Sequence, residues 1–287
     1  MTAITTEPTG RPAQRPAPRT SLGFGGVLRS EWIKLRSLRS TVWSYLVVIV
    51  VAVGIAVIMA FSMRDGVVAG DLSALPAADQ TRAVLQASMV GIYLGQLVVG
   101  VLGVLAISGE YTTGMIRSTL AAVPRRFAAL WAKAAVLFVA TFVVGVVALG
   151  AAFAAASIVL GSGGVSADLA DPGVVLTVLG GALYLALVAV FALGVGTMLR
   201  SSAGGIAVVL GIMMLLPTVL QLIPAQWAQD LLPYLLSTAG FAIFNGSLNE
   251  PAAAATDPDA WQGLAIVLGW VAASLAGGAT LLKRRDA

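Results

Sequence analysis

The chain has no cysteine and no histidine, and each absence removes a class of chemistry. Without cysteine there is no disulfide, no thiolate nucleophile and no cysteine-ligated metal. Without histidine as well, a zinc ion would have to be held by carboxylates alone, unlike the sites that zinc occupies in proteins. Charge is scarce too, since 10% of the residues are charged, against about 25% in ordinary soluble domains.

What the chain has instead is apolar sequence, which makes up 59% of its 287 residues. Six stretches of about 20 or more residues carry no formal charge, which is the length that crosses a hydrocarbon core of about 30 Å. The sequence therefore predicts an all-α polytopic membrane protein with six transmembrane helices. The predicted spans are 43–63, 88–108, 134–160, 174–198, 203–223 and 262–282. The third is long enough to tilt or to project from the bilayer.

The distribution of charge predicts the orientation of these spans. With the N-terminus inside, 15 of the 17 lysines and arginines fall on cytoplasmic segments, and only Arg64 and Arg82 fall outside. Nine of the 13 acids fall outside. Because cytoplasmic flanks collect Lys and Arg, both termini are predicted to be cytoplasmic. The inside lysines and arginines between the second and third spans are Arg117, Arg125, Arg126 and Lys133.

Two segments precede the first span. Residues 1–22 are rich in Pro, Thr and Arg and are predicted to be a disordered cytoplasmic tail. Residues 23–42 form a predicted amphipathic interfacial helix that lies along the lipid headgroups. A basic segment that only anchors the first span is the alternative. Residues 43–287 then make up the six-span domain. The apolar stripe of the helix is Leu28, Trp32, Leu35, Leu38 and Val42.

Two further segments are neither spans nor plain loops. Residues 109–127 contain GEYTTGMIRSTLAAVPRR, which predicts a compact, charged cytoplasmic hairpin suited to docking another protein. A hairpin whose basic residues only fix the topology is the alternative. Residues 231–244, on the outside, are apolar but too short to span, which predicts a re-entrant or interfacial element. A loose extracellular cap is the alternative there.

Three residues within the spans suggest close packing or bending. Gly91 and Gly95 have the small-xxx-small spacing that lets helices approach closely, either inside one subunit or at a dimer seam. Pro217 is predicted to kink the fifth span, which would matter for gating.

Two stretches together resemble a known family. SEWIKLRSLRSTVW at 30–43, followed by SGEYTTGMIRSTLAAVPRR at 108–126, is similar to the permease subunits of ABC-2 type transporters, particularly the actinobacterial kind. The resemblance implies a type V exporter-like permease fold and a homodimer or pseudo-dimer of six-span subunits. It also implies two cytoplasmic ABC ATPase subunits, which would contact the N-terminal helix and act on 109–127 as a coupling hairpin. The residues that match the ATPase-coupling interface are Glu31, Trp32, Lys34, Leu35, Arg36, Glu110, Tyr111, Gly114, Arg117, Pro124 and Arg125.

The function that follows is a permease subunit of the bacterial plasma membrane that exports an amphiphilic substrate such as a drug, antibiotic, lipid or peptide. We expect no enzymatic activity, because none of the three lysines, Lys34, Lys133 and Lys283, stands in the Gly-Lys-Ser/Thr pattern of a P-loop. ATP and Mg²⁺ would bind the partner ATPase, and this chain itself would bind no cofactor, metal or nucleic acid. Two alternatives remain, a sodium-coupled carrier and a non-transporting scaffold. The charge-free spans argue against a carrier, because carriers usually bury ionisable residues in their spans. A scaffold would be distinguished by biochemistry, because it would neither stimulate a cognate ATPase nor be required by one.

Overall fold

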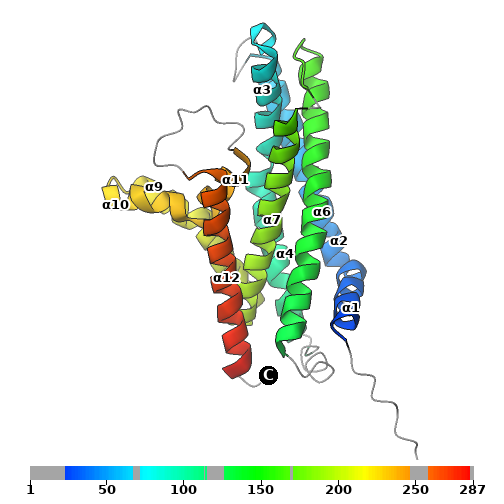
Figure 1. The fold of residues 1–287 in the computed structure, drawn as a ribbon, viewed down its shortest axis with the longest axis vertical. Helices are drawn as coiled ribbons and strands as arrows, with labels where there is room; N and C mark the ends of the chain where they lie inside the picture. Colours follow the sequence, from blue (N-terminus) through cyan, green and yellow to red (C-terminus); the bar gives the residue numbers. More distant parts are fainter. Residues whose placement is uncertain are drawn as a thin grey trace, which may run out of the picture.

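The computed structural model describes residues 23–66, 72–112, 114, 126–168, 171–245 and 258–284. In these ranges the chain is helical and contains no strand. It forms an elongated bundle, with a bent segment leaving it sideways (Figure 1). The helices of the first half are α1 Phe24–Ser37, α2 Arg39–Arg64, α3 Ala77–Met89, α4 Ile92–Thr112 and α6 Arg126–Gly161. Those of the second half are α7 Pro172–Leu199, α8 Ser202–Leu210, α9 Leu216–Leu222, α10 Gln226–Leu231, α11 Leu236–Asn245 and α12 Ala260–Arg284.

Six of these segments are long and apolar enough to cross a membrane, as the sequence predicts. They are Arg39–Arg64, Ala77–Tyr111, Phe127–Gly161, Pro172–Leu199, Ser202–Leu222 and Ala260–Leu282. Several extend beyond the charge-free runs, because a helix continues until its backbone is capped rather than until the lipid ends. At 36 residues α6 is about 54 Å long, which exceeds a hydrocarbon core of about 30 Å, and whether it tilts or projects stays a prediction.

The helix α7 lies at the centre of the bundle, between α6 and α12 in Figure 1. It is buried along most of its length, from Val174 to Thr197. Small residues allow its neighbours to approach closely: a Cβ added to Gly103 of α4 would lie 2.2 Å from the Ala189 carbonyl oxygen of α7. Helix packing through small residues is how membrane bundles gain van der Waals contact without a hydrophobic driving force.

This close approach gives a prediction for Gly103→Ala. The added methyl would overlap backbone, which cannot move aside as a flexible side chain can, so we expect a loss of about 1–3 kcal/mol in stability. Thermal unfolding of the detergent-solubilised protein, followed by size-exclusion chromatography, measures it. Gly54→Ala in α2 is the matched control, because nothing lies within 4 Å of a Cβ there. Equal melting temperatures for the two variants would contradict this packing.

The fifth span is not one straight helix. After α8 the chain makes a π-helical turn, Gly211–Leu215, and α9 then leaves the direction of α8 toward the side of the bundle (Figure 1). Pro217 stands at the start of α9, where it has no amide hydrogen for the preceding turn. The bend therefore falls where the proline predicts a kink, and a gating role for it stays a prediction.

The predicted element 231–244 consists of a 3₁₀ turn, Leu232–Tyr234, followed by α11. Helix α11 packs on α7 so closely that a Cβ at Gly240 would overlap the Tyr184 ring. Phe241 and Phe244 of α11 also lie against Tyr184, with ring centroids 5.7 and 6.3 Å away. The segment is thus a docked helix in the bundle, and its re-entrant character stays a prediction.

Candidate functional site

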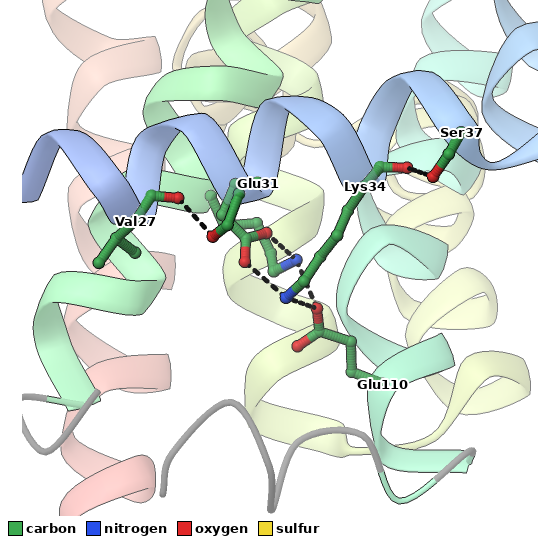
Figure 2. Close-up of polar contacts among 7 residues, drawn as sticks. Val27, Glu31, Lys34, Ser37 and Glu110 are labelled. Carbon is green, nitrogen blue, oxygen red and sulfur yellow. Dashed lines mark hydrogen bonds and ion pairs between the residues drawn. The ribbon is translucent and has the colours of Figure 1, made fainter. Parts of the chain in front are cut away.

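The N-terminal helix α1 is a separate element because the backbone breaks at Leu38. Leu38 is extended, with φ −77° and ψ 115°, and α2 starts again at Arg39. The helix therefore ends at Ser37 rather than continuing to Val42, the last residue of the predicted stripe. In Figure 2, α1 runs across α4 and α6 instead of continuing the line of a span.

The face that α1 turns toward the bundle differs from the predicted apolar stripe. Val27 and Glu31 are the buried residues of the helix, whereas Trp32 and Leu38 are 46% and 48% exposed. Positions 27, 31 and 34 follow one another at helical spacing, so they lie on one side of α1. A carboxylate can occupy the buried side only if cations neutralise it, and the neighbouring helices supply one of them.

Four charged side chains from three helices meet at this position (Figure 2). The Glu31 carboxylate accepts from Lys34 Nζ at 2.7 Å and from Lys133 Nζ, at the start of α6, at 2.6 Å. The Glu110 carboxylate, at the end of α4, accepts from Lys133 Nζ at 2.8 Å and from Lys34 Nζ at 3.3 Å. We call Glu31, Lys34, Glu110 and Lys133 the charge cluster.

The charge cluster is removed from water and is electrically balanced. The side chains of Glu31, Glu110 and Lys133 are 3%, 6% and 12% exposed, and that of Lys34 is 28% exposed. Two cations and two anions sum to zero, which lowers the cost of burying them. Removing one partner of a buried ion pair typically costs about 3–5 kcal/mol, because the remaining charge is left uncompensated.

Glu110 has one further feature. Its second carboxylate oxygen, Oε2, is buried and has no hydrogen-bond partner among the described residues. Glu31 differs, because each of its two oxygens accepts from a lysine. Glu31 is therefore the better satisfied of the two carboxylates.

The ionisation of Glu31 and Lys34 predicts how the charge cluster depends on pH. Burial alone would raise the pKa of Glu31, but the Lys133 and Lys34 ammonium groups outweigh it and hold the pKa below its usual range. Burial alone would lower the pKa of Lys34, but Glu31 and Glu110 hold it above its usual range. The contribution of Glu31 is present above its unfolded pKa and is lost as the pH falls through the lower folded value. That of Lys34 is present below its unfolded pKa and is lost as the pH rises through the higher folded value.

We therefore expect α1 to stay docked with constant stability from about pH 5 to about pH 9, between the ordinary pKa values of Glu and Lys. Because the chain has no cysteine, an Ile33→Cys variant can carry a fluorophore at a single exposed site on α1. The anisotropy of that label should be flat across this range and fall below about pH 4. A transition between pH 6 and 8 would contradict the assignment.

A second set of contacts joins the same end of α4 to the turn between α7 and α8. The Arg200 guanidinium lies over the Tyr111 ring, 5.3 Å from its centroid. Ser202 Oγ donates to Ser108 Oγ at 2.8 Å. Arg200 takes a left-handed conformation with φ 53°, which makes this turn tight. The end of α4 is thus held on two sides.

The structure brings together three of the residues predicted for the coupling interface, Glu31, Lys34 and Glu110. Of the others in α1, Trp32 and Arg36 point outward and Leu35 packs against the core. Gly114 has a φ of 71°, a left-handed turn conformation that glycine adopts readily. Arg117, Pro124 and Arg125 lie outside the described residues, as does most of the predicted hairpin. Contact with an ATPase stays a prediction for the whole set.

Lys133 is the residue of this site that sequence reasoning does not single out. In the sequence it counts only as one of the cytoplasmic positive charges. A signal was present, because lysine occurs three times in the chain and Lys133 stands inside a long apolar helix. An ionisable residue in such a place is expected to have a partner.

The two glycines singled out in the sequence pack within this chain. A Cβ at Gly91 would lie 2.6 Å from Ala52 Cα of α2, and one at Gly95 would lie 3.9 Å from Leu185 of α7. Two pairs of polar groups in the spans also bond within the chain: the Tyr184 hydroxyl donates to Gln96 Oε1, and the Tyr45 and Thr141 hydroxyls lie 2.9 Å apart.

Within the described residues there is no group of three or more acidic side chains placed to hold a metal ion. What the charge cluster can do is mechanical. It links α1 to the ends of α4 and α6, so a displacement of α1 moves both helices or breaks the buried ion pairs.

The comparison with protein families agrees with this architecture. The model of the family described as ABC-2 family transporter protein matches residues 27–226, which include most of α1, the charge cluster and the first five spans. A search of curated proteins gave no match. Since the matched segment covers most of the chain, the protein belongs to the ABC-2 family of transporters and is a multi-pass membrane permease subunit of an ABC transporter.

Proposed function

We propose that this subunit exports an amphiphilic substrate across a bacterial plasma membrane, with energy from ATP hydrolysed by a separate ABC ATPase. Two ATPase subunits and a second copy of this chain complete the transporter, and both termini of the chain are cytoplasmic. Membership of the ABC-2 family supports the partnership with an ATPase. The direction of transport rests on the resemblance alone, and the class of substrate rests on the charge-free predicted spans.

The observation that carries the mechanism is the charge cluster. It lies at the end of the bundle where α4 passes into the predicted coupling hairpin, and it ties α4 to α1 and α6. A protein that pushes on α1 or on the hairpin would therefore move three helices together. Packed interfaces tend to switch between discrete arrangements, so a push on α1 can be passed to α4 and α6 as one concerted movement. In this proposal the buried residues Glu31, Lys34 and Glu110 transmit the force, and Arg36 on the outer side of α1 touches the ATPase.

The amphiphilic substrate follows from the chemistry of the spans. The side chains of the spans are mostly apolar. The charged groups Glu110 and Lys133 near their ends are paired in the charge cluster, and the larger polar groups Tyr184 and Gln96 are bonded to each other. A pathway without free charge suits a molecule that is largely apolar. If a partner ATPase supplies the energy for transport by hydrolysing ATP, this chain needs no site that couples transport to the movement of an ion.

The test is affinity purification of the tagged subunit from its native membrane in mild detergent, with identification of the co-purifying proteins and an ATPase assay. We expect an ABC ATPase in the eluate, and activity that rises when the subunit is reconstituted in lipid. An intact, monodisperse preparation without any nucleotide-binding partner would overturn the proposal and favour the scaffold or the sodium-coupled carrier.

A further inference from the structure

The outer surface of the bundle beside the charge cluster combines arginines with exposed aromatic side chains. Trp32, Trp43, Trp131 and Phe127 are 46%, 64%, 56% and 45% exposed. Arg29 and Arg39 are exposed among them. We call this set the basic-aromatic collar, made of Arg29, Trp32, Arg39, Trp43, Phe127 and Trp131.

The members of the collar lie at the same end of the bundle, where the charge cluster joins α1 to the first turns of α6. Trp32 follows Glu31 in α1, and Trp131 precedes Lys133 by two residues in α6, while Glu31 and Lys133 are joined at 2.6 Å. Two residues correspond to 200° around a helix, so Trp131 points away from the bundle when Lys133 points into it. Arg39 and Trp43 occupy the first turns of α2, directly after α1.

This end of the bundle is the boundary of the apolar spans. The spans Ala77–Tyr111 and Phe127–Gly161 end and begin here. Exposed tryptophan at the end of a transmembrane helix marks the depth of the lipid headgroups. The occupant of the collar is therefore lipid rather than bulk water.

The charge of the collar selects the kind of lipid. Glu31 is the only acid of α1, and it is buried and bound by two lysines. No carboxylate among the described residues pairs with Arg29 or Arg39. The exposed surface of α1 and of the start of α2 is consequently cationic without a described counter-ion.

The opposite end of the bundle provides the contrast. There Arg64 pairs with Asp65 at 3.0 Å and Arg82 pairs with Asp79 at 3.1 Å. The arginines of that end are neutralised by neighbouring acids of the chain, whereas those of the collar are not. The two arginines of the collar therefore remain available to an anion from outside the described residues.

We propose that the basic-aromatic collar binds the headgroups of anionic phospholipids and thereby holds α1 against the membrane surface. The tryptophans fix the depth, and Arg29 and Arg39 provide the selection for negative charge. An arginine at such a surface strengthens binding to anionic lipid by about fivefold. This inference does not depend on ATP-driven export, because it concerns the docking of α1 to lipid.

The experiment uses the full-length subunit reconstituted in vesicles of equal parts phosphatidylcholine and phosphatidylglycerol, then extracted in mild detergent. The phospholipids that stay bound are quantified. We expect the wild-type protein to retain phosphatidylglycerol over phosphatidylcholine by about fivefold or more, and the Arg29→Gln/Arg39→Gln variant to retain the two within about twofold of each other.

The matched control is Arg64→Gln/Arg82→Gln, which removes two arginines from the far end and should leave the wild-type ratio unchanged. Arg36 is left intact in both variants because it is a predicted ATPase contact. A wild-type ratio near one, or an equal effect of the two double variants, would overturn the proposal. The Arg29→Gln/Arg39→Gln variant could also keep the wild-type lipid ratio but lose a co-purifying ATPase. That result would show that this surface binds protein, and it would overturn the proposal as well.

Discussion

Replacement of Lys133 by methionine should release α1 from the bundle and abolish transport. Lys133 contacts both carboxylates of the charge cluster, at 2.6 and 2.8 Å, and its side chain is 12% exposed. Without it, Glu31 and Glu110 share Lys34 alone, and a net negative charge is left buried. At about 3–5 kcal/mol for a broken buried pair, amide exchange in residues 24–37 should quicken by at least about 100-fold.

Hydrogen exchange measured by mass spectrometry, together with transport in reconstituted vesicles, checks this result. The control is the double variant Lys133→Met/Glu110→Gln, which restores neutrality because Glu31 and Lys34 remain as one pair. Replacing a buried ion pair by neutral groups is often tolerated, so protection of α1 should largely return. A double variant as unprotected as Lys133→Met would show that α1 depends on the shape of the lysine rather than on charge balance.

Reversal of charge at Glu110 should be the other severe change. Glu110→Lys places three cations around the single carboxylate of Glu31, at a position where the glutamate is 5% exposed. Repulsion in a buried site cannot be screened by solvent as it is on a surface. We expect transport and ATPase stimulation to fall by at least about tenfold, while membrane insertion stays normal because the apolar spans are unchanged.

The matched control is Asp79→Lys, the same kind of reversal at the exposed Arg82–Asp79 pair, where both side chains are 40% exposed. An exposed pair contributes about 0–1 kcal/mol, so this variant should transport normally. Membrane fractionation and transport assays on the two variants give the comparison. Equal activity would show that the charge cluster does not transmit force. The predicted hairpin residue Arg117 gives a further comparison, because its reversal should also abolish transport without affecting insertion.

The sequence predicts the spans well because lipid imposes a simple length requirement on apolar runs. It predicts helix ends less well. The polar segment Ala77–Met89 contains Asp79, Gln80 and Arg82, so hydropathy does not attach it to the second span, yet it is helical. It is held by contacts made across the chain, since Ser166 N donates to Gln80 Oε1 at 2.6 Å.

The candidate site was only partly predictable, because its residues stand in local motifs but their contacts join distant parts of the chain. Glu31, Lys34 and Glu110 stand in motifs that resemble the family, but the resemblance implies contact with an ATPase for all of them. In the structure the two carboxylates face inward and bind Lys133, 102 residues after Glu31 and 23 after Glu110. No local pattern gives that pairing, because it depends on how α1 crosses α4 and α6.

The sequence by itself determined that this is a six-span, all-α membrane protein without thiol or imidazole chemistry, because composition and the length of apolar runs decide these properties directly. Only the tertiary structure decided which charges are buried and which are exposed. Glu31 and Arg29 stand two residues apart on one basic helix, but packing against α6 turns the first toward Lys133 and leaves the second at the surface. Burial of a charge requires a counter-ion within reach, and the fold, not the local sequence, places it there.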